Sequence, residues 1–109
     1  MLMRPGRPVR REAHGMPCID VALAEDIDLD TAPLVRSWLQ VAVDANPGGT
    51  LRVDLTGTSV LDEAGLAVLV GVLLGMRETG GEVVLINVGP AARATLQLTR
   101  LDRVFGFER

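Results

Sequence analysis

Aromatic residues, lysine, histidine and cysteine are scarce or missing in this chain of 109 residues. It contains two phenylalanines, one tryptophan and no tyrosine, so its core must consist mainly of aliphatic side chains. The single cysteine, Cys18, excludes an internal disulfide and is typical of a reducing compartment. The only histidine, His14, forms no nucleophile–base pattern, and the absence of lysine excludes the Walker phosphate-binding motif. We therefore expect a protein without enzymatic activity and without a cofactor.

Long apolar runs are also absent. The run Leu66–Met76 has eleven residues, whereas about 20 are needed to cross a bilayer. The charged N-terminus is not followed by an apolar segment of the length that a secretory signal requires. We expect a cytoplasmic protein with no stable membrane insertion.

The charges are distributed unevenly along the chain. Four arginines and one acid lie in the first fourteen residues, whereas seven arginines and thirteen acids follow, a net charge of −6. An acidic body argues against nucleic acid as the partner, because phosphate contacts require a positive surface. Asp26, Asp28 and Asp30 have the spacing that begins an EF-hand, but Thr31 and Ser37 stand where glycine and glutamate are required. No metal site is expected.

Alternating strand and helix patterns predict an α/β fold. Strands are expected at residues 18–24, 51–55, 82–88 and 103–109, and helices at 31–44, 66–78 and 89–101. This order predicts a mixed, mostly parallel sheet of four or five strands with about three helices. We assign residues 17–109 to one domain and expect residues 1–16 to be flexible or to add an edge strand.

The spacing of apolar residues predicts which helix faces point inward. The expected inward residues are Leu34, Val35, Trp38, Leu39, Val41, Ala42, Leu66, Leu69, Val70, Leu73, Leu74, Leu96, Leu98 and Leu101. The helix expected at residues 66–78 also has apolar residues or glycines on its other faces, including Gly71 and Gly75. Such a helix is either fully buried or in contact with a partner, and the pattern leaves both possibilities open.

The motif LDEAGL, residues 61–66, places two neighbouring carboxylates before this apolar helix. Side chains that are adjacent on a helix diverge by about 100°, so Asp62 and Glu63 cannot readily share a proton as a catalytic dyad. Asp62 is instead well placed to accept hydrogen bonds from free backbone N–H groups, and both charges complement the helix dipole. The motif predicts a helix start with Asp62 as its cap.

In order and spacing, four motifs resemble the STAS domain of bacterial anti-sigma factor antagonists. They are EDIDLDTAP, RVDLTG, DEAGL and GGEVVLINVGPAARATLQLTRLD, and the likeness runs from about Cys18 to Phe105. The resemblance implies a STAS-like fold and a binding module that acts by partner switching. In that family, the unphosphorylated protein binds an anti-sigma factor that is also a serine kinase of the GHKL type. This binding frees a sigma factor.

The chain departs from this family at the residue that relatives phosphorylate. The acceptor position, just before the motif glycine, is Ala64, and it is preceded by Glu63, where serine is frequent. Alanine has no hydroxyl, so phosphorylation cannot occur at the usual site. Ser59 is a nearby candidate for phosphorylation, although it does not align with that site. Either the protein is permanently unphosphorylated or Glu63 alters which partner it accepts, and we favour the first.

The resemblance also assigns a partner-binding surface. Its expected residues are Asp28, Asp62, Glu63, Ala64 and Gly65 at the rim, with Leu66, Val68 and Val72 as apolar anchors. DEAGLA is similar as well to the STAS subunits of bacterial lipid-transport ABC systems, which bind an ATPase. The longer likeness over residues 80–102 favours the anti-sigma factor antagonist, and a homodimer is compatible with either function.

Overall fold

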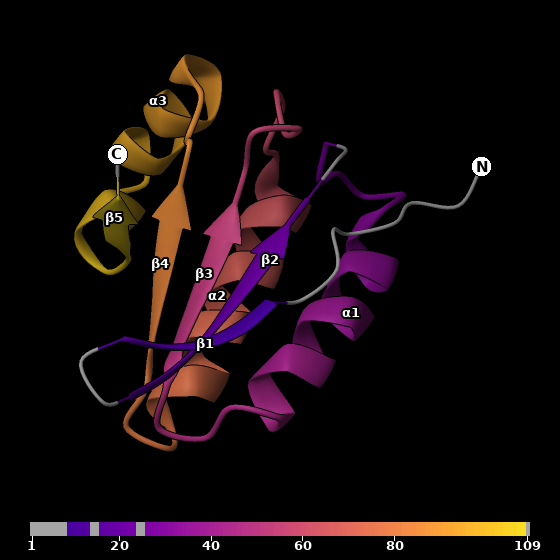
Figure 1. Ribbon diagram of the computed structural model, residues 1–109. Coiled ribbons are helices and arrows are strands. Elements are labelled where there is room, and N and C mark those ends of the chain that lie inside the picture. The colour runs from indigo at the N-terminus through magenta and orange to yellow at the C-terminus, as the bar shows by residue number, and fades with distance from the viewer. Residues whose placement is uncertain (1–8, 14–15, 24–25, 109) are drawn as a thin grey trace.

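The computed structural model describes residues 9–13, 16–23 and 26–108, which form a five-stranded sheet and three helices (Figure 1). The elements are β1 (Val9–Ala13), β2 (Met16–Ala22), α1 (Ala32–Asp44), β3 (Thr50–Asp54), α2 (Glu63–Arg77), β4 (Glu82–Ile86), α3 (Pro90–Leu98), the 3₁₀ turn η1 (Leu101–Arg103) and β5 (Gly106–Glu108). Strand β1 is antiparallel to β2, and the other neighbouring strands are parallel. The predicted mixed, mostly parallel α/β fold is confirmed.

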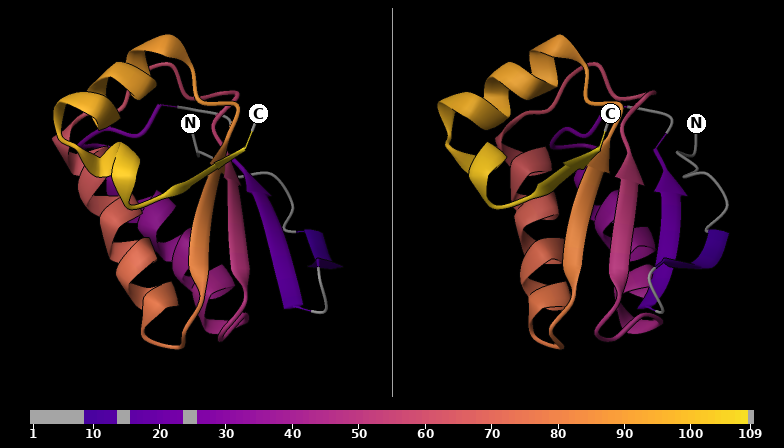
Figure 2. Two further views of the ribbon diagram at one scale, coloured as in Figure 1. Left: turned by 90° about the vertical axis from the view of Figure 1, so that its left-hand side faces the viewer. Right: turned by 60° about the vertical axis from the view of Figure 1, so that its left-hand side comes forward.

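The strand order follows the chain order, β1-β2-β3-β4-β5. Connections between neighbouring parallel strands are right-handed crossovers. Because successive strands are added on the same side of the sheet, these crossovers place their helices on one and the same face. Helices α1 and α2 accordingly lie side by side on one face of the sheet, as the two turned views show (Figure 2). None of the helices in the described part of the chain has the length and apolarity to span a bilayer.

The core fills the space between the sheet and these two helices. The parallel register aligns Ile19 with Leu51 and Leu51 with Val83, which makes a row of aliphatic side chains across three strands. A second row comprises Val21, Val53 and Leu85. The helices contribute Val35, Leu39, Val68, Leu69, Val72 and Met76, among others. The prediction of an aliphatic core is confirmed.

Four residues that were expected to face inward are exposed. They are Leu34, Val41, Leu74 and Leu98, with exposed fractions of 39%, 68%, 57% and 86%. In α1 the face that meets the sheet carries Val35, Leu39 and Ala42, and a residue next to one of these positions is rotated by about 100° around the helix axis. Because many residues of these helices are apolar, their pattern left the rotation of the helix undetermined.

Helix α2 is buried on most of its surface but not on all of it. A Cβ added at Gly75 would lie 3.1 Å from Val43 Cγ1, so this glycine permits the close approach of α1. Gly71 faces open space, and Ala67 and Leu74 lie on the same exposed side. Of the two possibilities that the sequence left open, internal packing therefore accounts for most of α2, and one outward line remains apolar and uncovered by the described residues.

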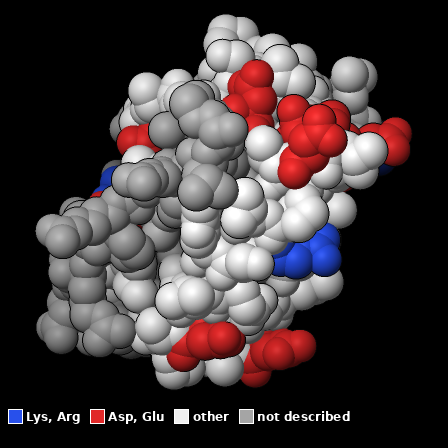
Figure 3. All heavy atoms as spheres, turned by 90° about the vertical axis from the view of Figure 1, so that its right-hand side faces the viewer, with Lys and Arg blue, Asp and Glu red and all other residues white. Residues whose placement is uncertain are grey.

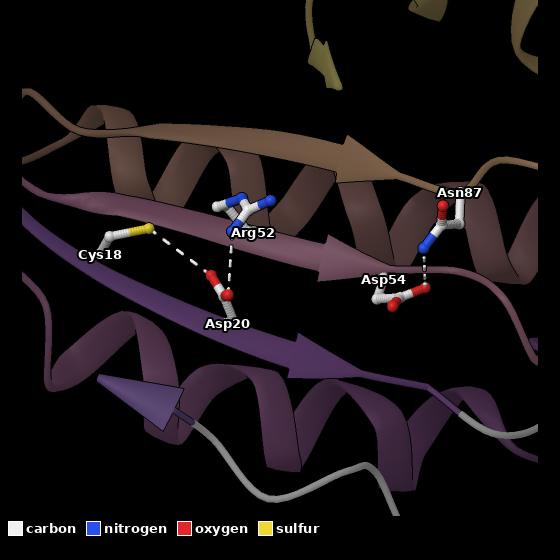
Figure 4. A network of polar contacts seen from close by, with 5 residues as sticks. All are labelled: Cys18, Asp20, Arg52, Asp54 and Asn87. Carbon is white, nitrogen blue, oxygen red and sulfur yellow. Dashed lines mark hydrogen bonds and ion pairs between the residues drawn. The ribbon is translucent and has the colours of Figure 1, made fainter. Parts of the chain in front are cut away.

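Polar side chains occupy the face of the sheet that points away from the helices (Figure 4). Arg52 forms an ion pair with Asp20 over 2.9 Å, and the thiol of Cys18 donates to the same carboxylate over 3.6 Å. On β4, Val84 is only half-buried, because no helix of the described chain covers this face. A continuous apolar run is typical of a strand covered on both faces; in β4 this holds at Ile86, which is buried, but not at Val84.

Candidate functional site

The start of α2 lies at the carboxyl end of the sheet and carries the DEAG motif. Asp62 is the N-cap residue, and its carboxylate accepts the N–H of Gly65 over 3.0 Å. Glu63 follows in the first turn, where its negative charge complements the helix dipole. The predicted capping function of Asp62 is confirmed.

Gly65 is buried where α2 packs against the segment that precedes α1. A Cβ at this position would lie 2.5 Å from the carbonyl oxygen of Ile27 and 2.7 Å from Leu61 Cδ1, both too close for any side chain. Ile27 and Leu61 also form a parallel β-bridge. Only glycine permits this contact, so the motif glycine has a packing function at this site.

Asp26 joins the two loops that surround the start of α2. Its carboxylate accepts the backbone N–H groups of Ser59 and Val60 over 2.7 and 2.8 Å. The N–H of Ile27 donates to the carbonyl of Val60 over 3.3 Å. The loop before α1 and the loop before α2 are therefore held together as one platform. No local sequence pattern indicates this function of Asp26, since its partners lie more than 30 residues further along the chain.

Asp28, a predicted partner-binding residue, organises the start of α1. One of its carboxylate oxygens accepts the N–H groups of Asp30 and Thr31 over 2.9 and 3.0 Å. Thr31 is the N-cap residue of α1, but its own side chain caps no helix N–H group. Asp30 and Thr31 are of the residue types preferred at helix N-termini, but neither side chain caps α1. The Thr31 hydroxyl donates instead to the carbonyl of Asp26.

A groove of about 430 Å³ lies between the first turns of α1 and α2. It is lined by Leu29, Ala32, Pro33, Arg36, Ala64 and Ala67. Leu29 is 78% exposed, although it is a large apolar side chain. Ala64 is half-buried and contributes a methyl group to the wall of this groove.

Figure 3 shows the face of the molecule that bears α1. Acidic atoms gather at its upper end, where α1 begins, next to uncharged surface with one group of basic atoms. Leu29 lies between Asp28 and Asp30 in the chain, and Ala64 follows Asp62 and Glu63. The apolar groove thus has an acidic rim. Leu29 lies between two aspartates in the sequence, but so does Ile27, which is buried, so the sequence alone does not distinguish the exposed residue from the buried one.

The hydroxyl groups near Ala64 lie in other surroundings. Thr58 is buried, and the Thr56 hydroxyl donates to Asp54 over 2.6 Å. Ser59 is exposed, but it lines a different depression, of about 330 Å³, together with Asn87 and the start of α3. Ser59 therefore lies outside the groove that Ala64 lines.

The carboxylate of Asp54 lies at the end of β3, beside this second depression. It accepts the Thr56 hydroxyl, the Thr56 N–H over 2.8 Å and the side-chain amide of Asn87 over 3.2 Å (Figure 4). Burial by itself would raise its pKa, but these hydrogen bonds stabilise the ionised form and outweigh burial. The pKa of Asp54 is therefore held below its ordinary value.

Three predicted site residues face the core. Leu66, Val68 and Val72 are exposed by only 7%, 1% and 3%, and they pack among the buried residues between α2 and the sheet. Their predicted role as apolar anchors on the surface is wrong, because they lie on the inward side of α2. The residues of the same helix that line the groove are Ala64, which is half-buried, and Ala67, which is exposed.

The acidic rim does not form a metal centre. No group of three or more His, Cys, Asp or Glu side chains in the described part of the chain is arranged to hold a metal ion. Asp26, Asp28 and Asp62 use carboxylate oxygens to bind backbone N–H groups. The arrangement of the groove and its rim is that of a binding surface.

Comparisons with known proteins identify the family of the chain. Residues 8–109 match the sequence profile of the STAS domain. The chain is 35% identical over 86 residues to the anti-sigma-B factor antagonist of Listeria monocytogenes, a match covering 79% of this chain and 75% of that protein. It is 32% identical to the anti-sigma-B factor antagonist of Bacillus subtilis, covering 79% and 77%.

The fold is similar to that of a solved protein from Thermotoga maritima, which is described as a putative anti-sigma factor antagonist. The TM-score is 0.78 with 18% identity, and the match covers 92% of this chain and 84% of that one.

Proposed function

The chain belongs to the STAS domain family, and we propose that it is an anti-sigma factor antagonist that binds an anti-sigma factor through the groove between α1 and α2. The observation that carries this proposal is the position of the family motif. DEAG begins α2 at the edge of an apolar groove, and Leu29 stands exposed beside it. A large apolar side chain at the rim of a groove is typical of a surface that contacts a partner.

The chemistry of this surface supports binding without catalysis. Around the groove the described residues provide methyl groups, one guanidinium and carboxylates that cap helices or join loops. The Thr31 hydroxyl donates to Asp28 over 3.3 Å, but it donates over 2.9 Å to the backbone carbonyl of Asp26 as well, which is a structural contact rather than the pairing of a nucleophile with a general base. We therefore assign the protein a non-enzymatic function in the regulation of transcription, acting in the cytoplasm.

The partner proposed here is an anti-sigma factor of the GHKL serine-kinase type, as the family resemblance implies. The two curated relatives above are anti-sigma-B factor antagonists, which favours this function over that of an ABC-transporter subunit. Binding of the anti-sigma factor by this chain would leave a sigma factor free to engage RNA polymerase.

Ala64 makes this binding insensitive to phosphorylation at the usual position. A phosphate adds about two negative charges, and at this position it would lie beside the carboxylates of Asp62 and Glu63 at the wall of an apolar groove. Repulsion and desolvation would then oppose the complex. A methyl group cannot carry this switch, so the chain remains in its binding form.

The experiment uses the purified chain, the variants Ala64→Ser and Ser59→Ala, and candidate GHKL-type anti-sigma factors encoded near the gene. Each pair is tested by calorimetric titration and by incubation with radiolabelled ATP. We expect the natural chain to bind without becoming labelled. We expect Ala64→Ser to become labelled and then to bind at least tenfold more weakly.

Two results would contradict the proposal. Label on the natural chain that disappears in Ser59→Ala would place the switch at Ser59 and refute permanent binding. Recovery of an ABC-transporter ATPase, in place of any anti-sigma factor, from a pull-down with the natural chain would refute anti-sigma antagonism itself.

A further inference from the structure

The groove between α1 and α2 has a charge as well as an apolar wall. Asp26, Asp28 and Asp30 lie in the loop that carries Leu29, and Asp62 and Glu63 directly precede Ala64. Among the residues that line the groove, Arg36 is the only cation. None of the five carboxylates forms an ion pair with an arginine in the described parts of the chain. The rim is therefore strongly negative.

Two of these carboxylates accept no hydrogen bond from the described chain. Asp26, Asp28 and Asp62 accept backbone N–H groups. Within the described chain, no hydrogen bond reaches the side-chain oxygens of Asp30 or Glu63, and both residues are exposed. A carboxylate that is exposed and unpaired beside an apolar groove is available to an external cation.

The combination restricts the kind of ligand. Phosphates and nucleic acids would be repelled by the rim. The carboxylates do not converge on a point in the way that a metal ion requires. A protein segment with an apolar side chain between basic residues fits both features of the groove. Its apolar side chain can pack against the apolar wall, and its basic side chains are attracted to the acidic rim, because potentials of opposite sign attract across an interface.

We propose that the groove receives a segment of the anti-sigma factor in which an apolar side chain is flanked by arginine or lysine. The apolar side chain lies against Leu29, Ala64 and Ala67, and the basic side chains pair with Asp30 and Glu63. This inference rests on the proposed function, because it specifies the chemistry of the same partner. It also assigns Leu29, Asp30 and Glu63 as the residues that determine specificity.

The test measures the affinity for the anti-sigma factor at about 50 and 300 mM NaCl. The double variant Asp30→Asn/Glu63→Gln keeps the shape of both side chains and removes both charges. We expect it to bind about tenfold more weakly at low salt and to show a much smaller salt dependence than the natural chain. The control Glu78→Gln removes an exposed acid at the other end of α2 and should change neither quantity.

Two further variants test the apolar wall and the sign of the charge effect. Leu29→Ala should weaken binding at least tenfold, whereas Leu98→Ala, which removes another exposed leucine on α3, should leave it unchanged. Arg36→Gln should strengthen binding two- to threefold, because it removes the one cation that repels a basic partner segment. Unchanged circular dichroism and melting temperature would exclude misfolding as the cause of any loss.

The outcomes separate this inference from the proposed function. If no anti-sigma factor binds the natural chain, the proposed function fails. If one binds but the double variant and Leu29→Ala bind equally well, the function stands and the inference about the groove is overturned. A self-association that Leu29→Ala abolishes would assign the groove to a second copy of the chain. A tenfold gain in affinity on deletion of residues 1–8 would assign it to the chain's own basic segment. Either result would also overturn the inference.

Discussion

The loops at the two ends of the sheet are joined to each other in different ways. At the carboxyl end, the carboxylate of Asp26 binds the backbone of the loop before α2. At the amino end, uncharged groups make the link: the Thr79 hydroxyl accepts the N–H of Gly48 over 2.9 Å, and the carbonyl of Gly49 accepts the N–H of Glu82 over 3.0 Å. Both ends are held by hydrogen bonds between segments far apart in the chain. A carboxylate takes part at the amino end too, where Glu82 accepts the Thr50 hydroxyl over 3.4 Å, but only at the carboxyl end does a carboxylate bind two backbone N–H groups of the other loop.

This difference shows that acidic character at the carboxyl end has two origins. Asp26, Asp28 and Asp62 stabilise the ends of loops and helices, and they would be needed even if nothing bound there. Asp30 and Glu63 make no such bonds within the described chain. An acidic surface is therefore not by itself a binding site. What distinguishes this end is the pair of unused carboxylates beside the exposed Leu29.

The largest effect is expected from Gly65→Ala, which would break the packing at the carboxyl end. The new Cβ would lie 2.5 Å from the carbonyl oxygen of Ile27, so the first turn of α2 must move away from the preceding loop. We expect a loss of about 3 kcal/mol in the free energy of unfolding, measured by urea denaturation.

Gly71→Ala is the matched control on the same helix. Nothing lies within 4 Å of a Cβ at this position, and alanine has the higher helix propensity. It should stabilise the protein by about 0.5–1 kcal/mol. If both substitutions changed the free energy of unfolding by the same amount, the close contact of Gly65 with Ile27 would not be what makes glycine necessary at position 65.

The next effect compares the two loop links directly. Asp26→Ala leaves the N–H groups of Ser59 and Val60 without their charged acceptor, and we expect a loss of about 2 kcal/mol. Thr79→Val removes the neutral acceptor of the Gly48 N–H and should cost about 1 kcal/mol. Urea denaturation of both variants measures the difference, and a larger loss in Thr79→Val would refute the greater importance of the charged link.

A smaller effect contrasts the two ends of α2. Asp62→Ala removes the cap of the Gly65 N–H and should destabilise the protein by about 1 kcal/mol, whereas Asp62→Asn, which still caps, should cost only about 0.3 kcal/mol. Glu78→Gln removes a negative charge from the opposite end of the helix dipole and should stabilise by about 0.3 kcal/mol. Thermal unfolding measures all three, and a loss of stability in Glu78→Gln would contradict the dipole argument.

The sequence predicted those features of the fold and site that depend on neighbouring residues. The strand and helix order follows from local periodicity, and the cap at Asp62 follows from an acid that directly precedes an apolar run. Both are confirmed in the structure. The position of Ala64 in the motif likewise led to the residue that lines the groove.

Features that depend on tertiary contacts could not be predicted in this way. Because α2 is apolar on nearly every side, the sequence could not distinguish the buried Val68 and Val72 from the exposed Ala67. The link from Asp26 to Ser59 spans 33 residues, and no local pattern indicates it. The exposure of Leu29 depends on where both helices begin relative to each other.

The smallest effect concerns pH and again distinguishes the two ends. Asp54 has a pKa below its ordinary value in the folded protein, because hydrogen bonds from Thr56 and Asn87 outweigh the effect of its burial. A group whose pKa is lowered on folding contributes stability that is fully present above its unfolded pKa of about 3.9 and is lost as the pH falls through the folded value. At the amino end, the hydrogen bond from the Gly48 N–H to the Thr79 hydroxyl contains no ionisable group.

We therefore expect Asp54→Asn to lose less stability than the natural chain when the pH is lowered from about 6 to about 3, in urea denaturation at constant ionic strength. Thr79→Val should lose as much as the natural chain, because the bond it lacks does not titrate. The same pH dependence in Asp54→Asn and in the natural chain would show that the hydrogen bonds at the end of β3 do not couple folding to protonation. A reduced dependence in Asp54→Asn alone would place a pH-sensitive contribution at the carboxyl end of the sheet, where the charged links lie.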